Sequence, residues 1–357
     1  MKAMIFRGPK QVTIENIPEP EVGPDDVLVR PLAVSFCFSE LHMYHGLWGH
    51  ELAGCTLGHE GVGVVQAIGS NVEGWSVGDK AVYDPTLGCG CCDLCNGGLR
   101  RACFTGPAGQ PFGLFADLFA APAYRWRPVP AELTVSGTAN IEPFSVGTRH
   151  MRHSGITTGD NVVFFGLDDY AGSALQWAAA SGLGKIAVVE PTKIRQDYAM
   201  SLGVDRVIDP SKENVPAAVR EIMPFGADAA FVSAEEYIPH AYRYLGDASR
   251  SVRLQGRLNI IRAYNGAIFE DFPGMEFWAK EQTLTGAGIA WADENWRGGQ
   301  ARGDFQATMD GAVKGHLDME RGLTKFSWDE IDSQKQLEEI LNALPHEIYK
   351  AQFTFAS

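Results

Sequence analysis

The sequence predicts a two-domain α/β protein, because its first part is rich in strands and its middle part alternates strands with helices. The chain has 357 residues, which is too long for one hydrophobic core and suggests about two domains of ordinary size. Strand-like runs separated by Pro and Gly fill residues 1 to about 145, and the alternation begins near residue 146. We therefore expect a compact antiparallel β domain followed by a parallel sheet built from βαβ units.

The strands of the first part are short runs of β-branched and aromatic residues that end at turn residues. They are expected at residues 3–6, 12–17, 26–34, 62–69 and 80–83.

The composition excludes several classes of partner. The formal net charge is −14 and the acidic residues are spread along the chain, so neither nucleic acid nor an anionic membrane is expected to bind. The chain is 45% hydrophobic and has no apolar run near the ~20 residues that cross a bilayer. The first ten residues contain no apolar secretory leader, so we expect a cytoplasmic protein.

Four cysteines, Cys89, Cys92, Cys95 and Cys103, follow the spacing C-x2-C-x2-C-x7-C. This spacing lets a loop fold back so that four thiolates converge on one ion, as in closed structural zinc sites. Disulfides are the alternative, but adjacent cysteines suit disulfide pairing poorly and a cytoplasmic location disfavours it. We therefore expect a structural zinc, with Cys91 as a bystander.

Earlier in the chain, Cys37 is followed some twenty positions later by His59 and Glu60. A thiolate, an imidazole and a carboxylate are ligand types that zinc accepts, and catalytic zinc keeps three protein ligands and an open position. Each of these residues alone is more often ordinary structure, but together they predict a catalytic metal site. Cys55 is expected to pack as a small hydrophobic residue.

The order of these motifs resembles that of the zinc-dependent medium-chain dehydrogenases, the family of alcohol, sorbitol, threonine and secondary-alcohol dehydrogenases. The matching features cover nearly the whole chain. They are Cys37 with Ser39, the GHE at 58–60, VGVV and the GD at 78–79, the four cysteines, the EP at 142–143 and the GD at 159–160.

The resemblance implies a GroES-like zinc catalytic domain at 1–145 that is completed by 286–357, and a Rossmann dinucleotide-binding domain at 146–285. It implies that Cys37 and His59 hold the catalytic zinc, with Glu60 as a direct or alternating ligand. Glu142 stands where polyol-type members place a glutamate. A small-molecule alcohol or ketone substrate and a homodimer or homotetramer are also implied.

The second domain has the strand and helix runs of a doubly wound parallel sheet. Strands are expected at 161–165, 185–190, 204–209, 228–234 and 257–264, and helices at 172–182, 194–203 and 214–223, with a long helical stretch before the last strand. The tail is expected to form helices at 305–317 and 333–344 and a strand at 350–355.

The phosphate-binding turn departs from the G-x-G-x-x-G pattern, because it reads Gly166, Leu167, Asp168, Asp169, Tyr170, Ala171. Gly166 can make the tight turn and Ala171 can replace the third glycine. Asp168 places a carboxylate where the cofactor phosphates approach. Three outcomes follow: Asp168 caps the next helix, which we favour, or the cofactor binds in a displaced position, or its binding is weak or lost.

Glu190 ends the second strand, about twenty residues beyond the turn, where an acid can accept hydrogen bonds from the ribose hydroxyls. An acid there disfavours a 2′-phosphate, so NAD is expected rather than NADP. Lys193 and Arg195 leave NADP open, because either could turn towards a 2′-phosphate. A solvated charge at the strand end is the structural alternative for Glu190.

Zinc would lower the pKa of a bound alcohol and so favour hydride transfer to a nicotinamide. Ser39 stands where the family begins its proton relay, and His42 either continues that relay or is structural. Phe38 and the aromatic segment at 43–50 suggest a bulky or cyclic secondary alcohol or ketone, unless these rings pack in the core. A polyol is the other substrate that the resemblance implies.

We therefore expect a zinc-dependent NAD(P)-dependent alcohol dehydrogenase. Two alternatives remain: an epimerase, lyase or reductase-type relative that uses a resident or different cofactor, and a non-catalytic zinc protein whose dinucleotide site has decayed.

Overall fold

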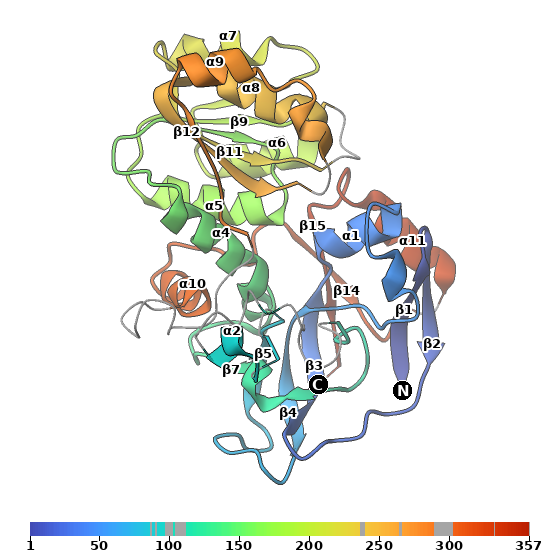
Figure 1. Cartoon of the computed structure of the whole chain (residues 1–357). Helices are drawn as coiled ribbons and strands as arrows, with labels where there is room; N and C mark the ends of the chain where they lie inside the picture. The colour runs from blue at the N-terminus through green and yellow to red at the C-terminus, as the bar shows by residue number, and fades with distance from the viewer. Residues whose placement is uncertain are drawn as a thin grey trace. The chain divides into compact units, whose positions relative to one another are not determined.

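The structure is a computed structural model that describes residues 1–85, 88, 89, 91–96, 103, 112–235, 240–263, 266–288, 303–331 and 333–356. The predictions for residues 97–102 of the cysteine loop, for residue 264 and for residues 289–302 of the tail lie outside this part of the chain. Contacts divide the chain into two compact units, Met1–Ser145 with Trp291–Ser357, and Val146–Ala290. The predicted α/β class is confirmed (Figure 1).

The first unit, Met1–Ser145 with Trp291–Ser357, contains a hairpin and a seven-stranded sheet. The hairpin pairs β1 (Lys2–Gly8) with β2 (Gln11–Asn16). The sheet has the order β14-β15-β3-β4-β5-β7, and β6 pairs with β3. Its strands are β3 (Asp26–Ser35), β4 (Glu60–Ile68), β5 (Lys80–Tyr83), β6 (Phe119–Pro122), β7 (Trp126–Pro128), β14 (Leu323–Ser327) and β15 (Lys350–Thr354).

All five strands expected in the first part of the chain are present. β3 alternates half-buried and buried residues along most of its length, which is the pattern of a strand with one face on the core. β6, β7 and β14, which are three to five residues long, were not expected. The sheet is antiparallel except that β14 and β15 run parallel.

The helices of this unit are short. They are α1 (Phe38–His45), α2 (Asp93–Asn96), α3 (Val135–Thr138), α10 (Asp304–Val313) and α11 (Gln334–Ala343).

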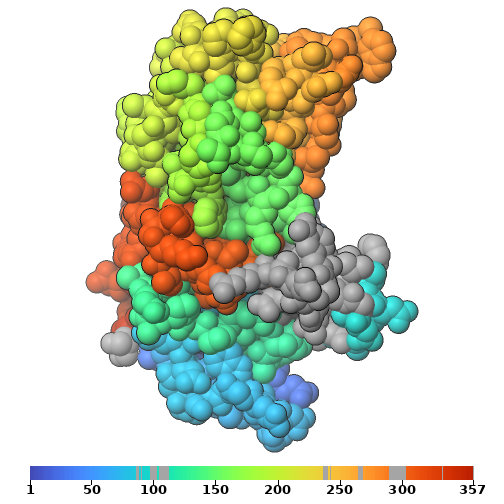
Figure 2. All heavy atoms as spheres, turned by 90° about the vertical axis from the view of Figure 1, so that its left-hand side faces the viewer, coloured from blue at the N-terminus to red at the C-terminus, as the bar shows by residue number. Residues whose placement is uncertain are grey.

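The C-terminal tail packs against residues 134–140 of the same unit. Asn140 Nδ2 donates to the carbonyl oxygen of Met319 at 2.9 Å, and Thr134 donates to Glu320. Figure 2 shows the orange-red C-terminal atoms beside the blue-green atoms of the same unit.

The second unit, Val146–Ala290, is a six-stranded parallel sheet with the order β10-β9-β8-β11-β12-β13. Its strands are β8 (Val162–Phe165), β9 (Ile186–Val189), β10 (Arg206–Ile208), β11 (Ala227–Ser233), β12 (Val252–Arg262) and β13 (Thr283–Gly286). Its helices are α5 (Asp169–Ala180), α6 (Lys193–Ser201), α7 (Val215–Ile222), α8 (Tyr244–Ser251) and α9 (Gly274–Ala279). Figure 1 shows α5 on one side of this sheet and α7 and α8 on the other.

The strand order reverses between β8 and β11, because the chain winds outward from β8 to β10 and returns to place β11 on the other side of β8. In doubly wound sheets, ligands bind at this switch point, beyond the carboxyl ends of the strands. β8 is buried along its whole length, as expected for a central strand covered on both faces. The turn after β8 is therefore the place where a dinucleotide is expected.

One long helix was missed. α4 (Ile141–His153) contains the boundary between the two units, and only its Glu-Pro motif was recognised in the sequence. Among the described helices, none is both long enough and apolar enough to span a membrane.

Candidate active site and metal centres

The four predicted structural ligands converge. The Sγ atoms of Cys89 and Cys95 lie 3.8 Å apart and those of Cys92 and Cys103 lie 3.7 Å apart, and all four sulfurs are within 4.8 Å of one another. A tetrahedral zinc with Zn–S bonds of about 2.3 Å has S–S edges of about 3.8 Å, whereas a disulfide is about 2.05 Å long. The geometry therefore fits a closed zinc site. Cys91 is exposed and lies at the edge of the cluster, with its Sγ 3.6 Å from that of Cys89.

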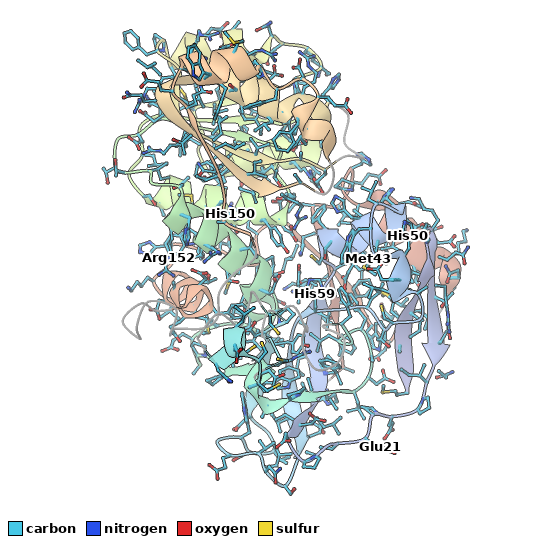
Figure 3. The ribbon with its side chains drawn as sticks, in the orientation of Figure 1. Glu21, Met43, His50, His59, His150 and Arg152 are labelled. Atoms are coloured by element: carbon cyan, nitrogen blue, oxygen red, sulfur yellow. The ribbon has the colours of Figure 1, made fainter. Side chains whose placement is uncertain are left out.

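The second predicted group also converges. Cys37, His59 and Glu60 are all buried, and their ligand atoms lie within 4.8 Å of one another. Cys37 follows the end of β3, and His59 and Glu60 stand at the start of β4, which pairs with β3 through Ser35 and Glu60. Figure 3 marks His59 among the side chains of this unit. Three ligands of these types leave room for an open coordination position, so the group fits a catalytic zinc.

Glu40 positions two of these ligands, a role that was not predicted from the sequence. Its Oε2 accepts the N–H of Cys37 at 3.1 Å, and its Oε1 accepts the N–H of Gly58 at 2.6 Å and lies 3.3 Å from Nδ1 of His59. A partner on Nδ1 directs Nε2 of the imidazole towards a metal. The capping-box spacing of Cys37 and Glu40 on α1 is the signal that could have revealed this contact.

The charge around His59 favours a cation. Burial alone would lower the pKa of His59, but the thiolate of Cys37 and the carboxylate of Glu40 outweigh burial and raise its pKa well above the usual value. Zinc would compete with a proton for this group of ligands.

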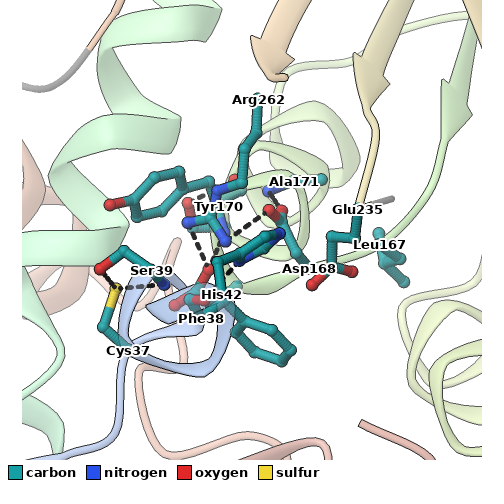
Figure 4. A network of polar contacts seen from close by, with 12 residues as sticks. Cys37, Phe38, Ser39, His42, Leu167, Asp168, Tyr170, Ala171, Glu235 and Arg262 are labelled. Carbon is teal, nitrogen blue, oxygen red and sulfur yellow. Dashed lines mark hydrogen bonds and ion pairs between the residues drawn. The ribbon is translucent and has the colours of Figure 1, made fainter. Parts of the chain in front are cut away.

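The predicted relay residues stand on α1 beside the group (Figure 4). Ser39 donates from Oγ to Sγ of Cys37 at 3.0 Å, and its backbone N–H donates to the same sulfur at 3.3 Å. His42 is fully buried, and its Nδ1 donates to the carbonyl oxygen of Phe38 at 2.5 Å. This bond places a proton on Nδ1, so Nε2 is the acceptor whenever the imidazole is neutral.

Glu60 has a partner that the sequence did not suggest. Nζ of Lys350, the first residue of β15, lies 2.6 Å from Oε2 of Glu60, and both side chains are at most 4% exposed. A buried carboxylate requires such compensation. The carboxylate of Glu60 thus contacts a cation of the chain and also lies within 4.8 Å of the ligand atoms of Cys37 and His59.

Glu142 does not join this group. It is 3% exposed in the first turn of α4, and among the described residues the carboxylate within 4.8 Å of Cys37 and His59 is that of Glu60.

The aromatic segment at 43–50 is not a continuous lining. Met43 and Tyr44 are buried, and the ring of Tyr44 packs under the ammonium group of Lys10, 4.3 Å from its centroid. The alternative that the side chains of this segment pack in the core is therefore correct for Met43 and Tyr44. Phe112, which the sequence did not single out, lies edge-on to His59 with a centroid distance of 5.2 Å.

The turn after β8 is built as a glycine turn. Gly166 has a φ of +77°, and a Cβ there would lie 2.1 Å from the carbonyl oxygen of Ser233. Asp168 is the N-cap of α5, and its Oδ1 accepts the N–H of Ala171 at 2.8 Å. The favoured outcome for Asp168, helix capping, is confirmed.

This turn does not fit a pyrophosphate in its present conformation. The N–H of Ala171 is taken by Asp168, and the N–H of Tyr170 donates to Oδ1 of Asp169 at 3.0 Å. The guanidinium of Arg262 lies 3.0 Å from each of the two carboxylates. The sequence predicted the repulsive charge of Asp168, but it did not predict its counter-ion.

Glu190 is neither a solvated charge at the end of its strand nor a carboxylate that is open to a ribose. It is fully buried; Oε1 accepts the N–H of Thr192 at 2.8 Å and Oε2 accepts the N–H of Leu167 at 3.0 Å. Burial raises its pKa, and Arg195 at 3.8 Å opposes that rise. The carboxylate instead ties β9 to the turn after β8.

Arg195 is also fully buried, and its main partner is the carboxylate of Glu235. Lys193 is exposed and pairs with Asp197. Both cations that left NADP open are thus engaged with carboxylates.

Comparisons with known proteins agree with this two-part architecture. Residues 23–131 match the family described as "Alcohol dehydrogenase GroES-like domain", and residues 172–300 match that described as "Zinc-binding dehydrogenase". A sorbitol dehydrogenase of Bacillus subtilis is 29% identical over 73% of this chain and 74% of its own. A probable D-xylulose reductase A of Aspergillus terreus is 30% identical over 64% of this chain and 68% of its own.

Among solved structures, the 2R,3R-butanediol dehydrogenase of Bacillus subtilis superposes with a TM-score of 0.81 at 25% identity, covering 99% of both chains.

Proposed function

The chain belongs to the zinc-dependent medium-chain dehydrogenase family and is an oxidoreductase of alcohols, and we propose that its reaction takes place at the group formed by Cys37, His59 and Glu60. The observation that carries the proposal is the convergence of three buried ligand types around a position that can stay open to substrate. The family uses zinc and a nicotinamide cofactor. A zinc ion held here would supply a Lewis acid for the substrate oxygen.

The chain's own residues orient this site and handle the proton. Glu40 holds Cys37 and His59 in position through three contacts of 2.6 to 3.3 Å, counting that to the neighbouring Gly58. The hydroxyl of Ser39, now 3.0 Å from the sulfur of Cys37, is the group that we assign to receive the proton of the alcohol. His42, with the acceptor Nε2 of its neutral tautomer, is assigned to the next step.

The substrate class that we propose is a polyol or secondary alcohol. The relatives named as sorbitol dehydrogenase, D-xylulose reductase and butanediol dehydrogenase support this class. The ring of Phe112 against His59 supplies an apolar wall beside the metal position. A bulky or cyclic alcohol was expected because the segment at 43–50 is aromatic. Met43 and Tyr44 are buried, so they do not support that expectation.

NAD is the cofactor that we propose over NADP. Arg195 pairs with Glu235 and Glu190, and Lys193 pairs with Asp197, so these cations are neutralised by carboxylates. Near the end of β9, the two carboxylates of Glu190 and Glu235 share the single cation Arg195. The remaining negative charge would repel a 2′-phosphate.

The structural zinc at the four cysteines and a homo-oligomeric state are further parts of the proposal. β13 is the edge strand of the second sheet and is largely exposed. Met275 and Trp278 on α9 are 76% and 73% exposed. An exposed sheet edge and large exposed apolar side chains favour association with another copy.

The experiment is a substrate panel measured by nicotinamide absorbance, with sorbitol, xylitol, 2,3-butanediol and ethanol, each with NAD and with NADP. We expect the highest kcat/KM for a polyol or a secondary alcohol with NAD. A preference for ethanol, or for NADP, would overturn the corresponding part of the proposal.

A further inference from the structure

The N-terminus of α5 already holds two anions, and both belong to the chain. α5 is a helix of twelve residues, Asp169–Ala180, and its first amides carry the partial positive charge that attracts phosphate groups in dinucleotide-binding folds. The N–H of Tyr170 donates to the carboxylate of Asp169 at 3.0 Å, and the N–H of Ala171 donates to that of Asp168 at 2.8 Å. Two side-chain carboxylates thus take the positions at which a pyrophosphate would accept hydrogen bonds.

Arg262 closes this arrangement from the end of β12. Its Nη1 lies 3.0 Å from Oδ2 of Asp168, and its Nη2 lies 3.0 Å from Oδ1 of Asp169. The guanidinium stacks on the ring of Tyr170, with 3.8 Å between the guanidinium carbon and the ring centroid (Figure 4). All three charged side chains are at most 5% exposed. The cluster of Asp168, Asp169 and Arg262 carries two negative charges and one positive charge in a place with little solvent.

We propose that Asp168 and Asp169 close the phosphate-binding turn against the pyrophosphate of a dinucleotide, and that Arg262 is the cation for which carboxylates and pyrophosphate compete. The proposal rests on the proposed function in that it takes the ligand to be the family's dinucleotide. Binding requires the carboxylates to release the amides of Tyr170 and Ala171 and the guanidinium of Arg262. The wild-type protein therefore binds the dinucleotide weakly, and neutralising a carboxylate strengthens binding.

Protonation offers an independent way to remove one of these charges. Burial raises the pKa of Asp168 to about 6, Arg262 opposes this rise, and Asp169 and Glu235 add to it. Within the described residues, the charged groups that act on the pKa of Asp168 include Arg262 on β12, Asp169 on α5 and Glu235 after β11. Below about pH 6 the carboxyl group is neutral, so binding of an anion should be stronger at pH 5.5 than at pH 8.

The experiment measures binding of ADP-ribose by titration calorimetry, because this ligand carries the pyrophosphate and lacks the nicotinamide. The variants are Asp168→Asn and Asp169→Asn in the full-length protein. Asn keeps an oxygen that can cap the helix and removes the charge. We expect each variant to bind ADP-ribose about fivefold or more tightly than the wild type at pH 8. The gain in affinity of the wild type on going to pH 5.5 should be absent in Asp168→Asn.

Asp228→Asn is the matched control. Asp228 also accepts a backbone N–H, that of Asn161 at 2.7 Å, and also pairs with an arginine, Arg253, at 2.6 Å. Its replacement should leave ADP-ribose affinity unchanged. Unchanged or weaker binding in both Asp168→Asn and Asp169→Asn, or no binding by any variant, would overturn the proposal. Turnover of alcohols and zinc content do not enter this measurement, so the proposed function can fail separately.

Discussion

The carboxylate of Glu60, which lies within 4.8 Å of the ligand atoms of Cys37 and His59, is 2.6 Å from the ammonium group of Lys350, and both side chains of this pair are buried. The pair joins the start of β4 to the start of β15, so the last strand of the chain supplies a charge to a site built by the first part. We infer that Lys350 and a metal ion are alternative partners for the same carboxylate.

Lys350→Met should therefore make the protein more dependent on zinc. Without metal, the variant leaves the carboxylate of Glu60 buried without its cation, which costs about 3–5 kcal/mol of unfolding free energy. Zinc restores the missing positive charge, so the difference in melting temperature between the zinc-loaded and chelator-treated protein should be larger than in the wild type. Lys350→Arg is the control and should resemble the wild type. Equal zinc dependence in Lys350→Met and wild type would contradict the shared role of Glu60.

Cys95→Ser and Cys91→Ser separate a zinc ligand from its neighbour. Cys95 is buried on α2 within the group of four sulfurs, and Cys91 is exposed at its edge. Because binding energy at a structural zinc site is folding energy, Cys95→Ser should lose one zinc per chain and lower the melting temperature by on the order of 10 °C. Cys91→Ser should change neither quantity. Equal losses in the two variants, by metal analysis and thermal denaturation, would place Cys91 among the ligands.

Arg262→Gln should destabilise the second unit, because it leaves Asp168 and Asp169 buried without their cation. We expect a loss of about 3 kcal/mol in chemical denaturation. The triple variant that adds Asp168→Asn and Asp169→Asn should recover most of that loss, since no buried charge then remains in this cluster. Additive effects of the substitutions would show that the three side chains do not interact.

The stability of the protein should also depend on the protonation of Asp168. Its folded-state pKa of about 6 lies above the ordinary value of 3.8, so the folded protein holds a proton more firmly than the unfolded chain does. The resulting stabilisation is fully present below about pH 3.8 and is lost as the pH rises through about 6.

Between pH 4.5 and pH 7, the wild type should therefore lose on the order of 2 kcal/mol more stability than Asp168→Asn. Denaturant titrations of both proteins at the two pH values measure this difference. The same pH dependence in both proteins would assign it to other groups.

The sequence was most informative where the determining interactions are local. The spacing of the four cysteines predicted a cluster whose sulfurs are 3.7 and 3.8 Å apart in two of its pairs, because the loop that carries them is short. The alternation of strands and helices likewise predicted a parallel sheet, because each run carries its own periodicity. Asp168 was expected to cap α5, and it does, because a cap acts over three residues.

The sequence was least informative about contacts between distant segments. No local pattern connects Glu60 with Lys350 or Asp168 with Arg262, since these pairs depend on how strands from distant parts of the chain are brought together. Glu190 was expected to face a ribose, but the turn after β8 uses both of its oxygens on backbone N–H groups. The role of Glu40 lies between these cases, because its bond to Cys37 is local while that to Gly58 spans 18 residues.

The central claim, that Cys37, His59 and Glu60 hold a catalytic zinc, is tested most directly by the zinc content of purified His59→Ala measured together with its turnover of a polyol. We predict two zinc ions per chain in the wild type, one in the variant, an unchanged fold by circular dichroism and no turnover in the variant. A variant that keeps both zinc ions, or that loses one and still oxidises the polyol at the wild-type rate, would contradict the account.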